Sequence, residues 1–92
     1  MAPLPVQPVS ALPPLRPVQS SAVSRIGWQP LAGSSVGTVY IEWRDASGAP
    51  TGLYAYPGVS LFDWNQLANA ASIGQEANRL KRGHGGRARR VA

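Results

Sequence analysis

The prolines limit what this chain can fold into more than any other feature, because most of them lie at one end. Six of the nine prolines fall within residues 1–19, and the only charged residue there is Arg16. Each proline removes a backbone amide donor and fixes φ near about −65°, and it moves the preceding residue toward an extended conformation. This density excludes a helix or a central strand, so we predict an extended, Pro-rich arm over residues 1–19.

The residues between these prolines are mostly Leu and Val, whereas a solvating linker is usually rich in Gly, Ser or charge. An apolar arm suits the surface of another protein, although a free tail stays an alternative. P-x-x-P spacing, which aromatic grooves accept, occurs twice but is common in any Pro-rich stretch. We expect partner contacts from the following residues of the arm: Pro5, Pro8, Leu12, Pro13, Pro14, Leu15 and Pro17.

Residues 20–82 have the patterns of a small folded domain. Alternating apolar and polar residues predict strands over 20–28, 37–44 and 52–56, and the third is expected to stop at Pro57-Gly58. The middle strand is the clearest, because Val39, Ile41 and Trp43 share one face. Short turn-forming loops join the three segments, which indicates a three-stranded antiparallel meander.

Two helices are predicted after the meander. Ser60 and Ser72 are N-cap residues, and apolar residues at helical spacing follow each of them, over 61–71 and 73–82. Gly83 is expected to end the second helix. The fold class is therefore α+β, with the meander followed by two short helices and preceded by the extended arm. The predicted core consists of Val23, Ile26, Trp28, Val39, Ile41, Trp43, Leu53, Leu61, Trp64, Leu67, Ile73 and Leu80.

The positive charge is confined to the C-terminal end. The net charge is +5, but residues 1–78 hold three arginines and four acids. The last segment, residues 83–92, is a basic Gly/Arg tail that we expect to be disordered. The cations that could neutralise phosphates in a nucleic acid are Arg79, Lys81, Arg82, Arg87, Arg89 and Arg90.

Tyr54 and Tyr56 share one face of the third predicted strand and could stack nucleobases. Tyr40 and Arg44 would lie beside them if the second and third strands pair. The alternative is that the two tyrosines cover a core edge or a helix, and that the Arg tail is simply a solvated terminus.

The chain has few residues that could support catalysis or bind a metal ion. The chain has no cysteine, which excludes disulfides, Cys-ligated metals and a Cys nucleophile. Its single histidine, His84, lies between glycines, and each of the four acids has a structural explanation in a strand, turn or helix start. We expect a non-enzyme with no cofactor, no metal, no small-molecule substrate and no membrane contact. The N-terminus has no basic segment before an apolar one, so no signal peptide is expected.

Four pieces of the segment 18–82 also match a family pattern in order and spacing. Ser20-Ser21 leads into Ile26-Gly27-Trp28, a strand follows over 39–43, Tyr54-Ala55-Tyr56 reads Y-x-Y, and a closing helix holds Ser72, Gly74 and Asn78. This segment resembles the KTSC domain, found at the C-terminus of some lysyl-tRNA synthetases and as small bacterial and phage proteins. Ala77 replaces a usual aromatic residue, and 57–60 replaces a V-P helix start, as in a divergent member. The resemblance implies a β-meander followed by helices. It does not define a function, since the family's role is open, with RNA binding suggested for it.

Two functions are therefore expected. The favoured one is a structural or interaction subunit that docks on other protein subunits of a larger assembly, such as a phage virion, through its arm and small domain. It would be found in the virion if phage-encoded and otherwise in the cytoplasm. The alternative is a DNA- or RNA-binding module that uses the basic tail with Tyr54 and Tyr56.

Overall fold

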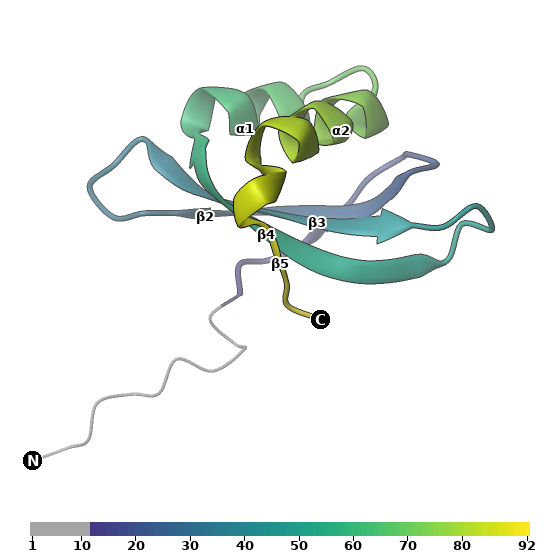
Figure 1. Cartoon of the computed structure of the whole chain (residues 1–92). Coiled ribbons are helices and arrows are strands. Elements are labelled where there is room, and N and C mark those ends of the chain that lie inside the picture. Colours follow the sequence, from purple (N-terminus) through teal and green to yellow (C-terminus); the bar gives the residue numbers. More distant parts are fainter. Residues whose placement is uncertain (1–11) are drawn as a thin grey trace, which may run out of the picture.

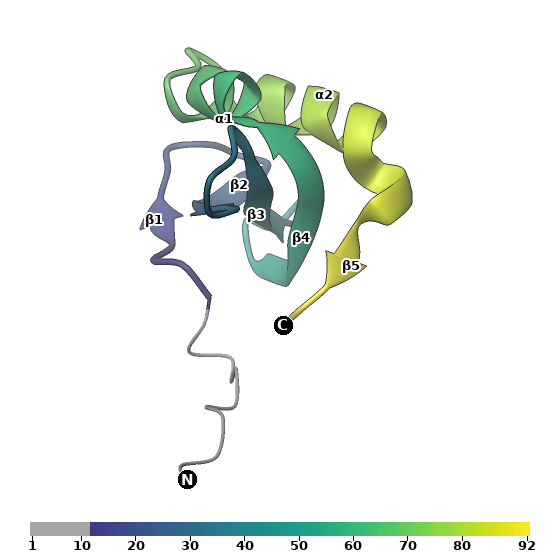
Figure 2. The ribbon, with the colours of Figure 1, turned by 90° about the vertical axis from the view of Figure 1, so that its left-hand side faces the viewer.

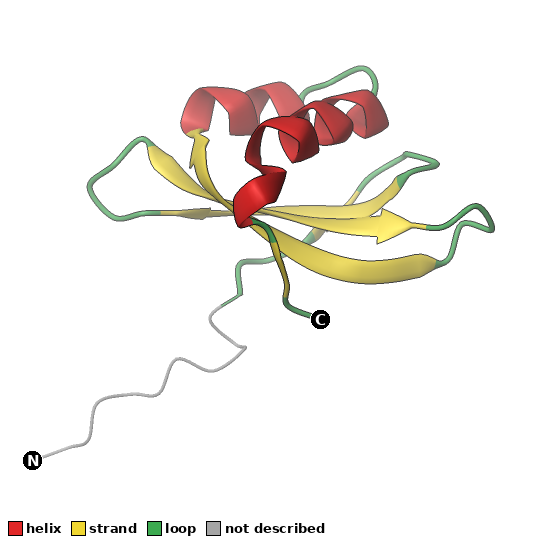
Figure 3. Ribbon diagram, in the orientation of Figure 1, coloured by secondary structure: helices red, strands yellow, loops and turns green. Residues whose placement is uncertain are grey.

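The computed structural model describes residues 12–92, which form an antiparallel five-stranded sheet with two helices across one face (Figures 1 and 3). The strands follow one another in chain order across the sheet, β1-β2-β3-β4-β5. The predicted α+β class is confirmed. In chain order the elements are β1 (Arg16–Pro17), β2 (Val23–Pro30), β3 (Val36–Arg44), β4 (Pro50–Ser60), α1 (Leu61–Ala68), α2 (Ile73–His84), the 3₁₀ turn η2 (Gly85–Arg87) and β5 (Arg89–Arg90).

The three long strands β2, β3 and β4 correspond to the predicted three-stranded meander, but the sheet has two further strands, β1 and β5, that were not predicted. The strand β4 is also longer than expected. The prediction that it stops at Pro57-Gly58 is wrong, because β4 continues to Ser60. The pairing register with β3 shifts between Gly37 and Val39, and Gly58 has a φ of 75°. Glycine adopts this left-handed conformation at little cost, so an irregularity at Pro57-Gly58 bends the strand without ending it.

Both helix starts are as predicted. The hydroxyl of Ser60 accepts a hydrogen bond from the Asp63 amide at 3.1 Å, and that of Ser72 accepts one from the Gln75 amide at 3.3 Å. The ends differ from the prediction. α1 stops at Ala68 rather than at residue 71, and α2 runs past Gly83 to His84.

The main core lies between the sheet and the helices. Its buried members are Val23, Ile26, Val39, Ile41, Tyr56, Val59, Leu67, Ile73, Ala77 and Leu80, with Trp28, Trp43 and Trp64 packed partly buried against them. The rings of Trp28 and Trp64 stack with centroids 5.8 Å apart and join the sheet to α1. Leu61 was predicted in this core but is 44% exposed, because it lies at the first position of α1 on the outer side.

The opposite face of the sheet, which we call the arm-side face, carries a second small cluster of Tyr40, Leu53 and Ala55. Leu12 and Leu15 from the N-terminal segment and Val91 from the C-terminus pack against it. Figure 2 shows both ends of the described chain below the sheet, on the side away from the helices. Both ends of the described chain therefore pack on the arm-side face, which the helices do not contact.

Each chain end also adds an edge strand. β1 pairs with β2, and β5 pairs with β4 through Tyr54↔Arg90 and Ala55↔Arg89. The expectation of a disordered tail over residues 83–92 is wrong, since this segment forms η2 and β5 on the edge of β4. Unpaired backbone groups along an edge strand accept a further strand readily, and the apolar side chain of Val91 adds packing.

Candidate functional site: a basic–aromatic pocket

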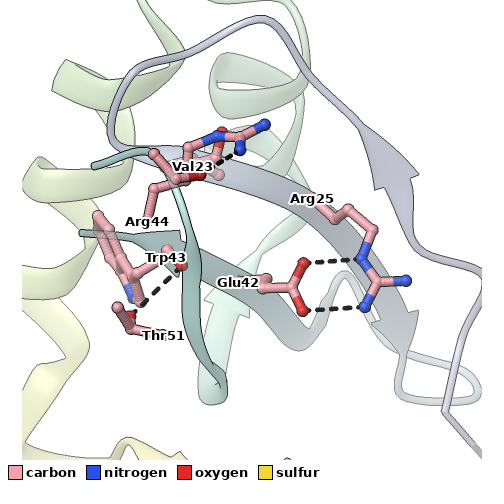
Figure 4. Close-up of polar contacts among 7 residues, drawn as sticks. Val23, Arg25, Glu42, Trp43, Arg44 and Thr51 are labelled. Atoms are coloured by element: carbon pink, nitrogen blue, oxygen red, sulfur yellow. Dashed lines mark hydrogen bonds and ion pairs between the residues drawn. The ribbon is translucent and has the colours of Figure 1, made fainter. Parts of the chain in front are cut away.

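All four carboxylates of the chain are occupied by contacts within it. Glu42 receives two hydrogen bonds of 2.9 Å from the guanidinium of Arg25 across β2 and β3 (Figure 4). These bonds hold the pKa of Glu42 below its ordinary value and that of Arg25 above it. Asp45 accepts hydrogen bonds from Ser47 within its turn, which lower the pKa of Asp45.

The other two acids share one cation. Arg79 forms ion pairs with Glu76 at 2.8 Å and with Asp63 at 3.3 Å, so it joins α2 to the start of α1. Its pKa is raised, first by the hydrogen bond to Glu76. Within residues 12–92, the cations that form no ion pair with a carboxylate are Arg16, Arg44, Lys81, Arg82, Arg87, Arg89 and Arg90.

Four of these seven cations line one hollow of about 500 Å³, where the C-terminal end of α2 and the η2–β5 segment approach the end of β3 and the start of β4. This size falls within the roughly 300–1,000 Å³ typical of ligand pockets. We call it the basic–aromatic pocket, and no acid lines it. Its lining residues are Trp43, Arg44, Thr51, Tyr54, Tyr56, Lys81, Gly85, Ala88, Arg89 and Arg90.

The sheet register explains why Trp43, Tyr54 and Arg90 meet. Residues directly opposite each other on paired strands point to the same face, and Trp43 is opposite Gly52 while Tyr54 is opposite Arg90. Gly52 lacks a side chain between them. A Cβ placed there would lie 3.1 Å from Nε of Arg90 and 3.3 Å from Cε1 of Tyr54. Glycine at this position therefore leaves the room that the guanidinium of Arg90 takes up.

The three aromatic residues of the pocket differ in how accessible they are. Tyr56 is only 2% exposed, and its hydroxyl accepts a 2.9 Å hydrogen bond from Nε1 of Trp43. Burial raises the pKa of Tyr56, and this hydrogen bond partly opposes the shift. The ammonium of Lys81 lies 5.3 Å from the centroid of the Trp43 ring, in cation–π contact. Tyr54 is half-buried and lies next to Arg90, which leaves it the most available tyrosine.

The predicted tyrosine surface is thus only partly present. Tyr54 and Tyr56 do share a face, but that face is the one beneath the helices, and Tyr56 belongs to the main core. The expectation that Tyr40 lies beside them is wrong. Tyr40 is on the arm-side face in the second cluster, opposite Ala55.

Two of the three pocket arginines, Arg44 and Arg90, donate hydrogen bonds to backbone oxygens. Arg44 donates to the carbonyls of Val23 and Gly48, the former drawn in Figure 4. Arg90 donates to the carbonyl of Thr51, which ties β5 to β4, and to the backbone oxygen of Ala92, the last residue of the sequence. Peptide carbonyls fix the position of a guanidinium without cancelling its charge, so the charge of Arg44 is not neutralised by its partners.

Of the six predicted phosphate-binding cations, the structure brings Lys81, Arg89 and Arg90 to the pocket. Arg79 is neutralised by its two acids, and Arg82 is exposed elsewhere on α2. Arg87 lies with His84 at a neighbouring hollow. The expectation that Arg44 lies beside Tyr54 and Tyr56 holds, because all three line the pocket. Sequence reasoning did not assign Trp43 and Thr51 to such a site, although it placed Trp43 on the apolar face of its strand.

The predicted partner-binding residues of the arm lie elsewhere. Pro5 and Pro8 are outside the described residues. Pro13 is buried and Leu12 and Leu15 are half-buried against the chain's own sheet, whereas Pro14 and Pro17 are exposed. Contact between this arm and a partner stays a prediction.

Residues 12–92 offer neither a metal-binding cluster nor a membrane-spanning helix. No three His, Asp or Glu side chains gather there in a way that could hold a metal ion. The helices of that range are too short and too polar to span a lipid bilayer.

Comparison of the chain with protein-family models, with curated proteins and with solved structures found no match. The resemblance to the KTSC domain stays a prediction.

Proposed function

We propose that this chain binds the phosphate backbone of a nucleic acid at the basic–aromatic pocket. The observation that carries the proposal is that four cations, Arg44, Lys81, Arg89 and Arg90, line one hollow that has no acid in its lining. Within residues 12–92 none of the four forms an ion pair with an Asp or Glu side chain. Arginine and lysine are the side chains that bind phosphate most strongly, through charge-assisted hydrogen bonds.

The charge pattern supports a polyanion rather than a single carboxylate ligand. Lys81 and Arg82 follow each other on α2, and Arg87, Arg89 and Arg90 follow within one short segment. Each phosphate contact releases condensed counterions, which changes the logarithm of affinity by about −0.7 to −0.9 per decade of salt. Contacts from all four pocket cations would give a slope of about −3 to −4.

The test is the salt dependence of binding to a fluorescently labelled oligonucleotide, measured by anisotropy. Lys81→Gln and Arg82→Gln form a matched pair, because both remove one charge from neighbouring exposed positions of α2 and only Lys81 lines the pocket. We expect Lys81→Gln to reduce the slope by about one and to weaken binding more than Arg82→Gln. Absence of binding at low salt, or equal effects of the two variants, would contradict the proposal.

A second candidate function is attachment to a larger protein assembly, and the exposed apolar side chains favour it. Leu31 is 64% exposed and Phe62 is 69% exposed, and Leu61 adds to them. They lie near the start of β3, opposite to the end that holds the pocket, because the amide of Leu31 donates to Val36 and that of Leu61 donates to Ser35. Exposed apolar patches of this kind are typical of interaction sites.

This second candidate has its own test, which leaves the sheet intact. Deleting residues 1–11 removes Pro5 and Pro8 but keeps residues 12–15 on the arm-side face, and Phe62→Glu changes the exposed apolar group. We expect the double change to abolish co-purification with the assembly from the native source while the melting temperature stays the same. Unchanged co-purification would contradict the candidate.

A further inference from the structure

The pocket combines positive charge with an aromatic ring inside a concavity, and this combination narrows the class of nucleic acid. A basic surface alone binds duplex and single strands alike. In a duplex both faces of every base are stacked on neighbours, so a base enters a hollow only when it leaves the helix. The hollow of about 500 Å³ is lined by Tyr54 and by four cations, Arg44, Lys81, Arg89 and Arg90. It is therefore suited to an unpaired nucleotide.

We propose that the basic–aromatic pocket receives one unpaired base of a single strand, stacked on Tyr54, and that the protein therefore binds single-stranded nucleic acid in preference to duplex. This inference rests on the proposed function and adds the substrate class to it. Stacking on an aromatic side chain is tolerant of base identity, because every base has a π-face.

Tyr54 is assigned this role by elimination within the pocket. Tyr56 is 2% exposed beneath the helices, so its ring cannot be reached. Trp43 is held by its hydrogen bond to Tyr56 and already has the Lys81 ammonium 5.3 Å from its ring centroid. Tyr54 is half-buried, lines the hollow and donates no hydrogen bond within the described chain that would fix its hydroxyl.

The phosphate adjoining such a base would find cations on two sides. Arg90 is directly opposite Tyr54 on β5, and Lys81 lies across the hollow on α2 over Trp43. The Thr51 side chain supplies a hydroxyl oxygen to the lining, and its one hydrogen bond within residues 12–92 is a long 3.4 Å contact to the Trp43 carbonyl. The pocket therefore offers a stacking surface, charge for the phosphate and one polar group within reach of a base edge.

The experiment compares a labelled single strand with a duplex of the same sequence, for the native chain and for Tyr54→Phe and Tyr54→Leu. Phenylalanine keeps the ring, whereas leucine keeps apolar packing against the core and removes the ring. We expect Tyr54→Phe to preserve the preference for the single strand. We expect Tyr54→Leu to weaken single-strand binding by about five- to 150-fold while duplex binding and the salt slope stay unchanged.

Each outcome separates this inference from the function on which it rests. Binding of neither nucleic acid at low salt contradicts the proposed function itself. Salt-dependent binding with equal affinity for the two forms leaves the proposed function standing and overturns the inference. An equal loss for both forms in Tyr54→Leu also overturns it. If Tyr54→Leu fails to fold, the comparison of single strand with duplex on the native chain still decides the question.

Discussion

Residues 12–15 should stabilise the sheet from the side away from the helices, and replacing Leu15 with alanine tests this. Leu15 packs half-buried against the cluster of Tyr40, Leu53 and Ala55. Truncation of a fully buried leucine to alanine costs about 2–5 kcal/mol, so a half-buried one should cost about 1–2 kcal/mol. For a domain of this size each kcal/mol lowers the melting temperature by about 4–8 °C.

The close approach of Leu15 to Gly27 sharpens this test. A Cβ at Gly27 would lie 2.6 Å from Cδ2 of Leu15 and 3.2 Å from the Pro14 carbonyl oxygen. Gly27→Ala therefore requires the end of the Leu15 side chain to move and the Pro14 carbonyl to give by a few tenths of an ångström. Overpacking of this kind costs about 1–3 kcal/mol. In the Leu15→Ala background the closest clash is gone, so Gly27→Ala should cost about 1 kcal/mol less than in the native chain.

The assay is equilibrium denaturation in urea, followed by tryptophan fluorescence for the native chain, both single variants and the double variant. Leu31→Ala is the control, because this exposed leucine lies outside the cluster and its truncation should change stability by less than about 0.5 kcal/mol. If Leu15→Ala matches Leu31→Ala, or if the effects of Leu15→Ala and Gly27→Ala simply add, residues 12–15 do not pack on the sheet and the argument is refuted.

Changes at three further positions should alter the stability of the fold in defined ways. The pKa of Glu42 is lowered in the fold, so its carboxylate adds to the free energy of unfolding above the ordinary glutamate pKa, and this stabilisation is lost as pH falls. Glu42→Gln should therefore flatten the acid limb of the curve of stability against pH. The pKa of Tyr56 is raised in the fold, so its neutral hydroxyl adds to the free energy of unfolding below the ordinary tyrosine pKa, and this stabilisation is lost as pH rises. Tyr56→Phe should flatten the alkaline limb, and it should cost about 1 kcal/mol at neutral pH because Trp43 loses its acceptor. Ser60→Ala should cost about 1 kcal/mol by removing the cap of α1, whereas Ser60→Asp should keep most of it; denaturation midpoints check all four variants.

The local signals in the sequence were sufficient for the middle of the fold. Alternation along β3 and the serine caps of both helices are short-range patterns, and they place these elements within a few residues of the observed bounds. The errors arise where distant contacts override local preference. Pro57 and Gly58 are turn formers, but the pairing of Val59 with Gly37 continues β4 past them.

The edge strands could not be predicted in this way. β1 and β5 have two residues each, which is too short for any periodic pattern, and both contain residues that disfavour regular structure or carry charge. They form because β2 and β4 offer unpaired backbone groups and because the arm-side cluster needs cover. Disorder was the natural expectation for a Gly/Arg segment considered alone, since its composition shows no core-forming side chain except Val91.

The same reasoning applies to the pocket, where composition predicted the charge but not its distribution. Residues 79–92 hold six cations, but Arg79 forms ion pairs with Asp63 and Glu76 and is not free to bind a ligand. Arg44 also lines the pocket, although it comes from residues 1–78, which have no net positive charge. A folded β5 changes what the remaining charges can do. Cations on a disordered tail would contact phosphates wherever the tail reaches, but β5 holds Arg90 at a fixed position opposite Tyr54. If the proposed binding takes place, a positioned charge beside the Tyr54 ring would discriminate between conformations of a nucleic acid, whereas a free basic tail would not.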